Sequence, residues 1–218
     1  HELKTPVAKH SMQLEILKPI ALEHRLSEEE QKALVVMEES IRRQESVIRN
    51  LLDLSRLEAG ERKYRREPVQ LDRLLAKTVE DYRYATEVHG MEVDLKVSPL
   101  LISSDAEMLW HLFSNILNNA IKFRRKGVPG RILVSVQQLD GEVQVRVRDD
   151  GIGMDAEDTD RAFSRFYQAS ASYEGSGVGL TICRMIAQGL GGRIVLESEG
   201  SGKGLTATVA LPFSQEMT

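Results

Sequence analysis

The spacing of apolar residues changes near residue 60, and this change limits the possible folds more than any other feature. Up to that point apolar residues recur at intervals of three and four, which is typical of helices with one buried face. The Ser27-Glu28-Glu29-Glu30 run is a capping box that starts the second of two such helices. Beyond Pro68, helical and strand-like patterns alternate. We therefore expect two domains, residues 1–66 and residues 67–218.

The first domain is predicted to be an α-helical hairpin. Each helix has a single apolar stripe, which begins at Leu3 in the first helix and at Leu34 in the second. Two helices with one stripe each close a poor core, so a homodimer that forms a four-helix bundle is the expected assembly. The alternative is that the hairpin packs on the second domain.

The second domain is predicted to be an α/β sandwich, with helices against one face of a mixed sheet. Asp140-Gly141 separates two alternating apolar segments and predicts a β-hairpin. The expected helices are 71–86, 105–122 and 177–188, and the expected strands are 91–97, 131–138, 142–149, 193–199 and 205–211.

Composition excludes several classes of function. The net charge of −4 disfavours nucleic-acid binding. A single cysteine, Cys183, excludes an internal disulfide and suits a reducing compartment. No apolar run approaches the roughly 18 residues of a membrane span, and no signal peptide is visible. Because the chain starts inside a helical pattern without an initiator methionine, we expect a cytoplasmic piece of a longer parent. We expect this piece to make no membrane contact, whether or not the parent is membrane-anchored.

The predicted helix 105–122 has an unusual polar face. At about 100° per residue, Asn115, Asn119 and Lys122 lie within roughly 60° of one another. A solvated face would favour Glu, Lys or Arg, because asparagine is a poor helix former. Amide oxygens suit Mg²⁺, which also binds phosphate oxygens, and the lysine supplies a positive charge for phosphate. This face is a candidate site for a metal-bound phosphate, and a plain solvated face is the alternative.

Asp149 ends the predicted strand 142–149 with the parity of its valines, so its carboxylate is expected to point inward. An inward carboxylate is costly unless it is hydrogen-bonded, and the amino group of an adenine would be a fitting donor. Asp150, on the opposite parity, is expected to be exposed. Gly151 and Gly153 permit close approach or unusual backbone angles. The alternative is a simple Asp-Gly turn.

A glycine-rich run, Gly175-Ser176-Gly177-Val178-Gly179-Leu180, opens a predicted helix. Backbone N–H groups left open by glycine, together with the positive end of the helix dipole, can bind phosphate. The spacing matches neither a dinucleotide-binding loop nor a P-loop. Upstream, Phe163–Tyr167 and the polar segment Gln168–Glu174 that follows it are predicted to form a mobile lid with an aromatic anchor, in which Arg165 could reach the terminal phosphate.

The chain starts with a histidine suited to act as a nucleophile. An unperturbed pKa of about 6.5 leaves His1 with a neutral nitrogen at cell pH, and Glu2 and Thr5 lie beside it on the predicted helix. The apolar stripe of that helix lies roughly 160° away, so His1 is expected to face solvent. Ala8 and Met12 run down the same side and form a candidate docking patch for a partner.

Together these segments resemble the motifs of the sensor histidine kinases of two-component signalling, over essentially the whole chain. His1–Pro6 resembles the phosphoacceptor box and Asn115–Phe123 the asparagine box. Asp149–Gly153 resembles the first glycine box and Gly175–Leu180 the second. Phe163–Tyr167 resembles the phenylalanine box, and Gly202–Thr206 resembles the last glycine-threonine segment. The implied fold is a dimeric helical hairpin followed by an α/β sandwich ATP-binding domain, of the type shared with DNA gyrase and Hsp90 chaperones.

The resemblance also implies roles for single residues. Asn115 and Asn119 would hold Mg²⁺–ATP. The other implied nucleotide contacts are Lys122 at phosphate, Phe123 in the pocket wall, Asp149 at the adenine and Thr206 beside it.

The implied reaction is ATP-dependent phosphorylation of His1, followed by transfer to an aspartate of a response regulator. Glu2 would act as general base or orient the imidazole, and Thr5 would help position water in the reverse, phosphatase reaction.

Two other classes of function stay open. An ATPase or molecular clamp would share the nucleotide fold, as chaperones and type II topoisomerases do, but the helical segment with its exposed His1 argues against it. A non-catalytic scaffold that docks a regulator would keep the fold, but the intact set of Asn115, Asn119 and Asp149 disfavours it.

Overall fold

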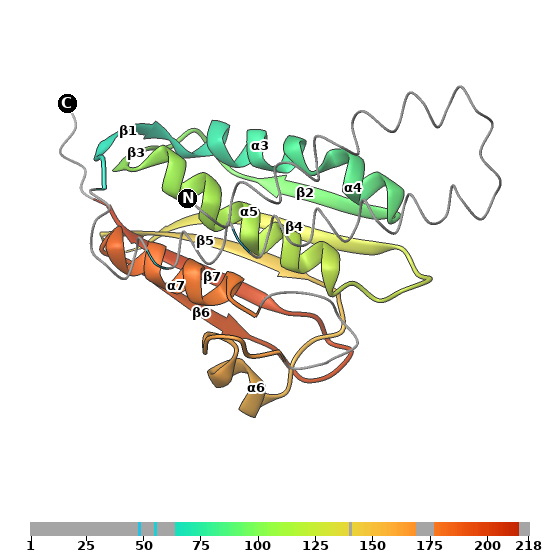
Figure 1. The fold of residues 1–218 in the computed structure, drawn as a ribbon. Helices are drawn as coiled ribbons and strands as arrows, with labels where there is room; N and C mark the ends of the chain where they lie inside the picture. The colour runs from blue at the N-terminus through green and yellow to red at the C-terminus, as the bar shows by residue number, and fades with distance from the viewer. Residues whose placement is uncertain (1–47, 49–54, 56–63, 140, 169–176, 214–218) are drawn as a thin grey trace, which may run out of the picture. The chain divides into compact units, whose positions relative to one another are not determined.

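A computed structural model describes Ile48, Ser55 and residues 64–139, 141–168 and 177–213 (Figure 1). The chain divides into two compact units, residues 1–56 and 57–218, and nearly all the described residues belong to the second. The predicted helical hairpin lies outside the described residues, apart from Ile48 and Ser55, which are helical, and the last three residues before β1.

The second unit is built on a mixed five-stranded sheet, as predicted. β2 and β4 pair in parallel, and the other neighbours pair antiparallel. The order across the sheet is β2 (Met91–Lys96), β4 (Gly130–Leu139), β5 (Glu142–Asp149), β7 (Thr206–Pro212) and β6 (Arg193–Glu197). The predicted hairpin joins β4 to β5, and Gly141 in its turn has a φ of +78°, which glycine adopts without strain.

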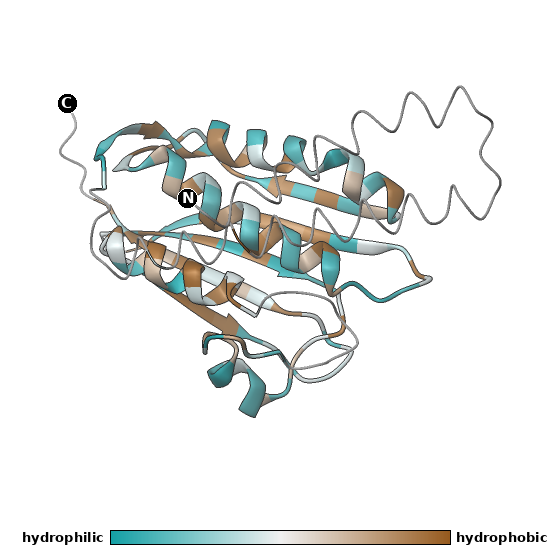
Figure 2. Cartoon of the chain, viewed as in Figure 1, coloured by the Kyte–Doolittle hydropathy of each residue, from teal (hydrophilic) through white to brown (hydrophobic). Residues whose placement is uncertain are grey.

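Three helices cover one face of this sheet (Figure 1). They are α3 (Leu71–Asp81), α5 (Ala106–Lys122) and α7 (Gly179–Gly189). Alternation along β5 turns its three valines, Val143, Val145 and Val147, into the core beneath them. In Figure 2 the brown, hydrophobic segments accordingly lie along the strands and on parts of the covering helices. None of the helices in the described ranges is both long and apolar enough to cross a bilayer.

The predicted helix 71–86 is divided in two, which corrects the sequence-based expectation. α3 ends before Tyr82, and α4 (Arg83–Val88) follows it. The two helices pack against different elements, α3 against α5 and α4 against β2. Each buries a threonine, Thr78 at 0% exposure in α3 and Thr86 at 5% in α4.

Three short elements of the structure were not predicted from the sequence. β1 (Glu67–Gln70) and β3 (Leu101–Ser104) pair antiparallel as a separate two-stranded sheet. α6 (Ala156–Arg161) lies between β5 and the lid segment. Each has only four to six residues, which is too short for a helical or alternating pattern to be recognised.

Candidate functional site

Helix α5 presents the predicted asparagine face. Asp105 caps its N-terminus by accepting from the Met108 N–H at 3.1 Å, and one side of the helix is buried in the core. Asn115 and Asn119 lie on the other side and are half-buried. The Asn115 amide Nδ2 donates to the carbonyl of His111 at 3.0 Å. This bond orients the side chain and leaves its oxygen, Oδ1, as the atom that can face a ligand.

The start of α7 lies against that oxygen. A Cβ atom added to Gly179 would lie 3.4 Å from Asn115 Oδ1, so the glycine-rich run and the asparagine face meet, although 64 residues separate them in the sequence. Gly177 has a φ of +68° and packs against the backbone of Phe166, where a side chain has no room. A helix N-terminus beside an amide oxygen offers both donors and an acceptor to a metal-bound phosphate.

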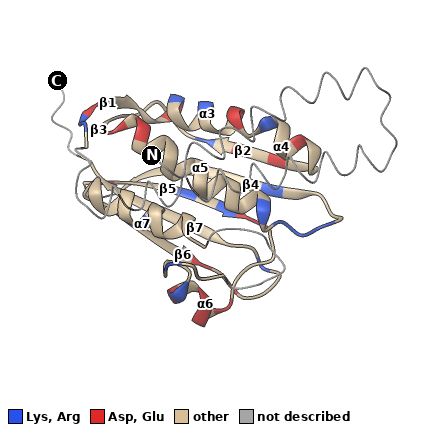
Figure 3. Ribbon diagram, viewed as in Figure 1, with Lys and Arg blue, Asp and Glu red and all other residues tan. Residues whose placement is uncertain are grey.

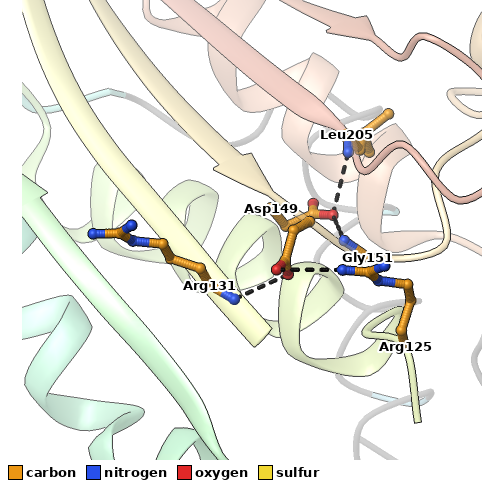
Figure 4. A network of polar contacts seen from close by, with 6 residues as sticks. Arg125, Arg131, Asp149, Gly151 and Leu205 are labelled. Carbon is orange, nitrogen blue, oxygen red and sulfur yellow. Dashed lines mark hydrogen bonds and ion pairs between the residues drawn. The ribbon is translucent and has the colours of Figure 1, made fainter. Parts of the chain in front are cut away.

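Asp149 is the buried carboxylate of the site (Figure 4), with an exposure of 8%. Its Oδ1 accepts two backbone hydrogen bonds, from Gly151 at 2.9 Å and from Leu205 at 3.2 Å. Within the described part of the chain, no donor bonds to its other oxygen, Oδ2. Burial raises the pKa of this carboxyl to about 6, the two hydrogen bonds oppose the rise, and the neighbouring charge of Asp150 adds to it. At neutral pH the site therefore offers a charged, buried acceptor.

Glycines let three backbone segments close around this carboxylate. A Cβ on Gly151 would lie 2.5 Å from the carbonyl oxygen of Phe123, and one on Gly204 would lie 2.0 Å from that of Asp149. Gly153 has a φ of +67° and packs in the same way on Gly200. The predicted close approach at Gly151 and Gly153 is therefore present. Their contact with a nucleotide stays a prediction.

Lys122 and Phe123 close the C-terminal end of α5. The Phe123 carbonyl accepts from the Ile152 N–H at 2.9 Å, which ties the helix end to the turn after β5. The Lys122 ammonium lies 4.4 Å from the centre of the Phe123 ring. The two residues thus lie beside the Asp149 turn, and their contact with a nucleotide stays a prediction.

Leu205 contacts Asp149 directly, and the position of Thr206 beside the adenine stays a prediction. Strand alternation turns the Thr206 side chain to the face opposite Ala207, away from the helices and from the Asp149 carboxylate. Leu205 binds the carboxylate through its backbone N–H. A backbone contact depends on strand pairing and not on residue type, so no sequence signal could have identified it.

Ser198 is a second residue near Asp149 that could not be identified from the sequence. Its hydroxyl donates to the Gly204 carbonyl at 2.7 Å and accepts from the Met154 N–H at 3.0 Å. It joins the segment after β5 to the loop before β7. A serine in a loop carries no pattern that would have distinguished it from its neighbours.

The aromatic anchor of the predicted lid is Phe163, which is buried. Its carbonyl accepts from the Thr181 hydroxyl at 2.9 Å and from Arg184 at 3.3 Å, so α7 holds it in place. Phe166 is 65% exposed and has a φ of +60°, which is uncommon for a phenylalanine. Arg165 is exposed, and its contact with a terminal phosphate stays a prediction.

The hydrogen-bond acceptors and donors of the site fit a purine nucleotide. One free oxygen on a buried carboxylate suits an amino group, and a helix N-terminus suits phosphate. Among the described residues no three His, Cys, Asp or Glu side chains gather into a metal site. His1, Glu2, Thr5, Ala8, Met12 and Gly175 lie outside the described residues, and their roles stay predictions.

Two family models match the chain. The model of histidine kinase-, DNA gyrase B- and HSP90-like ATPases matches residues 104–215, and the His kinase A (phospho-acceptor) domain model matches residues 1–60. The first covers the asparagine face, the Asp149 turn and the glycine-rich run, and the second begins at His1.

Several known proteins are similar over nearly the whole chain. The sensor histidine kinase WalK of Bacillus subtilis (strain 168) is 28% identical over 221 residues, which is 99% of this chain and 36% of that protein. The swarming motility regulation sensor protein RssA of Serratia marcescens is 29% identical over 218 residues, 98% of this chain and 45% of that protein. Full-length ShkA, solved in complex with AMPPNP, has a TM-score of 0.76 at 25% identity, covering 100% of this chain and 46% of its own. The chain thus spans between about a third and a half of the length of these proteins.

Proposed function

Because this chain belongs to the sensor histidine kinases of two-component systems, we propose that it is a kinase core that phosphorylates its own His1 with ATP and passes the phosphoryl group to an aspartate of a response regulator. The observation that carries the proposal is the Asp149 carboxylate. It is buried, held by two backbone N–H groups and open at one oxygen, next to the Phe123 end of α5.

The nucleotide would be held at both ends. Asp149 Oδ2 accepts from the adenine amino group, and the wall of the base site is formed by Phe123 and the Gly151 backbone. The phosphates meet Lys122 and the N-terminus of α7, with Arg165 at the terminal phosphate.

The metal would be Mg²⁺, shared between protein amides and phosphate oxygens. Asn115 and Asn119 would hold it through their side-chain oxygens. Mg²⁺ keeps several waters and needs few protein ligands, which suits a site made of two amides.

The phosphoryl acceptor would be the neutral imidazole of His1. A ring nitrogen attacks the γ-phosphorus, the bond to the bridging oxygen breaks, and ADP leaves. Glu2 takes up the imidazole proton or orients the ring. The phosphoryl group then moves to the aspartate of the regulator, and Thr5 positions water when the reaction runs as a phosphatase.

The partners would be a second copy of the chain and a receiver domain. The dimer buries the apolar stripes of two hairpins in a four-helix bundle. The receiver domain docks on the patch around Ala8 and Met12, below His1.

Incubation with ATP labelled on its γ-phosphate tests the proposal. We expect an acid-labile, alkali-stable label that is lost in His1→Gln and kept in His10→Gln, a control histidine on the same predicted helix. Addition of a receiver domain removes the label from the kinase. Steady hydrolysis without labelling would indicate an ATPase or clamp instead, and absence of nucleotide binding would indicate a scaffold.

A further inference from the structure

The segment that enters β1 is docked on the ATP-binding domain by three consecutive residues, Tyr64, Arg65 and Arg66, which belong to no motif of the site. We call these three residues the docked segment. The segment is basic, and it is blue in Figure 3 just before β1. Only residues 61–63 separate it from residues 1–60, the stretch that matches the His kinase A domain.

Tyr64 packs on the last turn of α7. A Cβ atom added to Gly189 would lie 2.0 Å from both the ring carbon Cζ and the hydroxyl oxygen of Tyr64, so the ring fills the space that a side chain would need. The Tyr64 hydroxyl donates to the carbonyl of Met185, one turn earlier, at 3.5 Å. Gly189 has an ordinary helical backbone, which alanine also adopts, so the ring explains why a glycine stands there.

The backbone of Arg65 is tied to the start of α5. Its N–H donates to Asp105 Oδ2 at 3.0 Å, and Oδ1 of the same carboxylate caps α5 at Met108. Asp105 is only 5% exposed, so the bond is shielded from water. The Arg66 guanidinium lies 3.6 Å from the position of a Cβ added to Gly191, beside the negative end of the α7 dipole. All three residues are therefore bound to the same domain.

Docking sets the length of the tether between the His kinase A match and the ATP-binding domain. With the segment docked, the tether consists of residues 61–63, and three extended residues span at most about 10 Å. With the segment released, the tether consists of residues 61–66, up to the start of β1, and spans at most about 20 Å. Effective concentration falls roughly as the −3/2 power of tether length, so doubling the tether lowers it about threefold.

We propose that Tyr64 is a positioning residue for autophosphorylation: by docking against Gly189 it shortens this tether, and so raises the rate at which bound ATP meets the phosphoacceptor histidine. The proposal rests on the function proposed above, in which His1 is the acceptor. Gly189 lies ten residues, or about 15 Å along α7, from Gly179 at the candidate phosphate site. Nucleotide affinity should therefore not depend on Tyr64.

Autophosphorylation of the full chain at saturating ATP, measured together with its affinity for a non-hydrolysable ATP analogue, tests the proposal. Tyr64→Ala should take up label about threefold more slowly and bind the analogue with unchanged affinity. Insertion of three glycines between Lys63 and Tyr64 lengthens the tether equally while the segment stays docked, and should give the same loss. Tyr64→Phe keeps the ring and should match wild type. Tyr84→Ala, which removes an exposed tyrosine of α4, is the control and should change neither quantity.

Gly189→Ala tests the docking itself. In the wild-type background its methyl group should displace the Tyr64 ring, lower the urea midpoint and slow autophosphorylation as Tyr64→Ala does. In the Tyr64→Ala background the same change should raise the urea midpoint, because alanine is a better helix former than glycine. Cleavage by trypsin after Arg65 should be several-fold faster in either single variant than in wild type, since the released backbone is open to the protease.

Unchanged labelling rates in both Tyr64→Ala and the insertion variant would overturn the proposal. Faster labelling in these variants would overturn it as well, because docking would then restrain the reaction. A loss of analogue affinity as large as the loss of rate would mean a merely structural role. If wild type bound the analogue and took up no label, the proposed function would fail. The urea and trypsin series would still decide the docking, and equal trypsin rates in all variants would refute it.

Discussion

Asp149→Asn is expected to stabilise the ATP-binding domain while removing its affinity for adenine. The asparagine oxygen can still accept from the Gly151 and Leu205 N–H groups, but an amide nitrogen replaces the free Oδ2. That nitrogen donates and cannot accept, so the amino group of adenine loses its partner. A hydrogen bond to a charged acceptor contributes about 1.5–3 kcal/mol, so we expect a loss of affinity of about 10- to 100-fold.

The stabilisation follows from the raised pKa of this carboxyl. The value rises from 3.8 to about 6, a difference of about 2 units, which corresponds to about 3 kcal/mol of unfolding free energy. Protonation of Asp149 favours the folded state, so this contribution is fully present below about pH 4 and is lost as the pH rises through 6. Asparagine carries no charge at any pH. The variant should therefore match wild type near pH 4 and exceed it by about 1–3 kcal/mol at pH 8.

Urea unfolding followed by tryptophan fluorescence measures this difference. Trp110 is the single tryptophan of the chain and lies on α5, so its signal reports this domain. A variant less stable than wild type by the same amount at pH 4 and pH 8 would refute the reasoning, because the buried charge would then carry no cost. Unchanged nucleotide affinity would refute the assignment of Oδ2 as the base acceptor.

Three further predictions concern packing and surface charge. Gly204→Ala should destabilise the domain by more than about 3 kcal/mol in urea unfolding, because its Cβ would lie 2.0 Å from a backbone carbonyl oxygen, whereas Gly202→Ala, at the similar φ of +77° and with open space around it, should cost only about 1 kcal/mol. Cys183 is buried and its thiol pKa is raised to about 12, so alkylation should proceed only at the rate of unfolding, and rapid labelling of the native chain would contradict this. Glu142→Gln breaks an exposed ion pair with Arg193 and should leave the urea midpoint unchanged.

Much of the fold could be predicted because its patterns are local. The alternation of Val143, Val145 and Val147 placed β5 and its inward face, and Asp149 followed from the same parity. The long helix α5 was predicted over 105–122, and the structure begins it one residue later, with Asp105 as its N-cap. The break at Tyr82 could not be foreseen, because the packing of α3 on α5 and of α4 on β2 is tertiary and leaves no local pattern.

The residue types of the candidate site could be predicted from the sequence, but the hydrogen bonds that hold its loops together could not. Asn115 and Asp149 stand out in the sequence because asparagine is rare in helices and a carboxylate is costly inside a sheet. The hydroxyl of Ser198 and the N–H of Leu205 have no such signal. Their contribution depends on which loops the sheet brings together, and this includes the contact of Asp150 with Arg125.

The sequence by itself determined which side chains share a face of each helix and strand, because periods of 3.6 and two residues are properties of the local backbone. It also supplied the proposed chemistry of the site: amides for a cation, a carboxylate for a base and glycines for phosphate. Only the tertiary structure decided that Leu205, 56 residues after Asp149, supplies the bond that holds this carboxylate. The physical reason is that the pairing of β5 with β7 joins distant segments through backbone groups, which every residue carries alike.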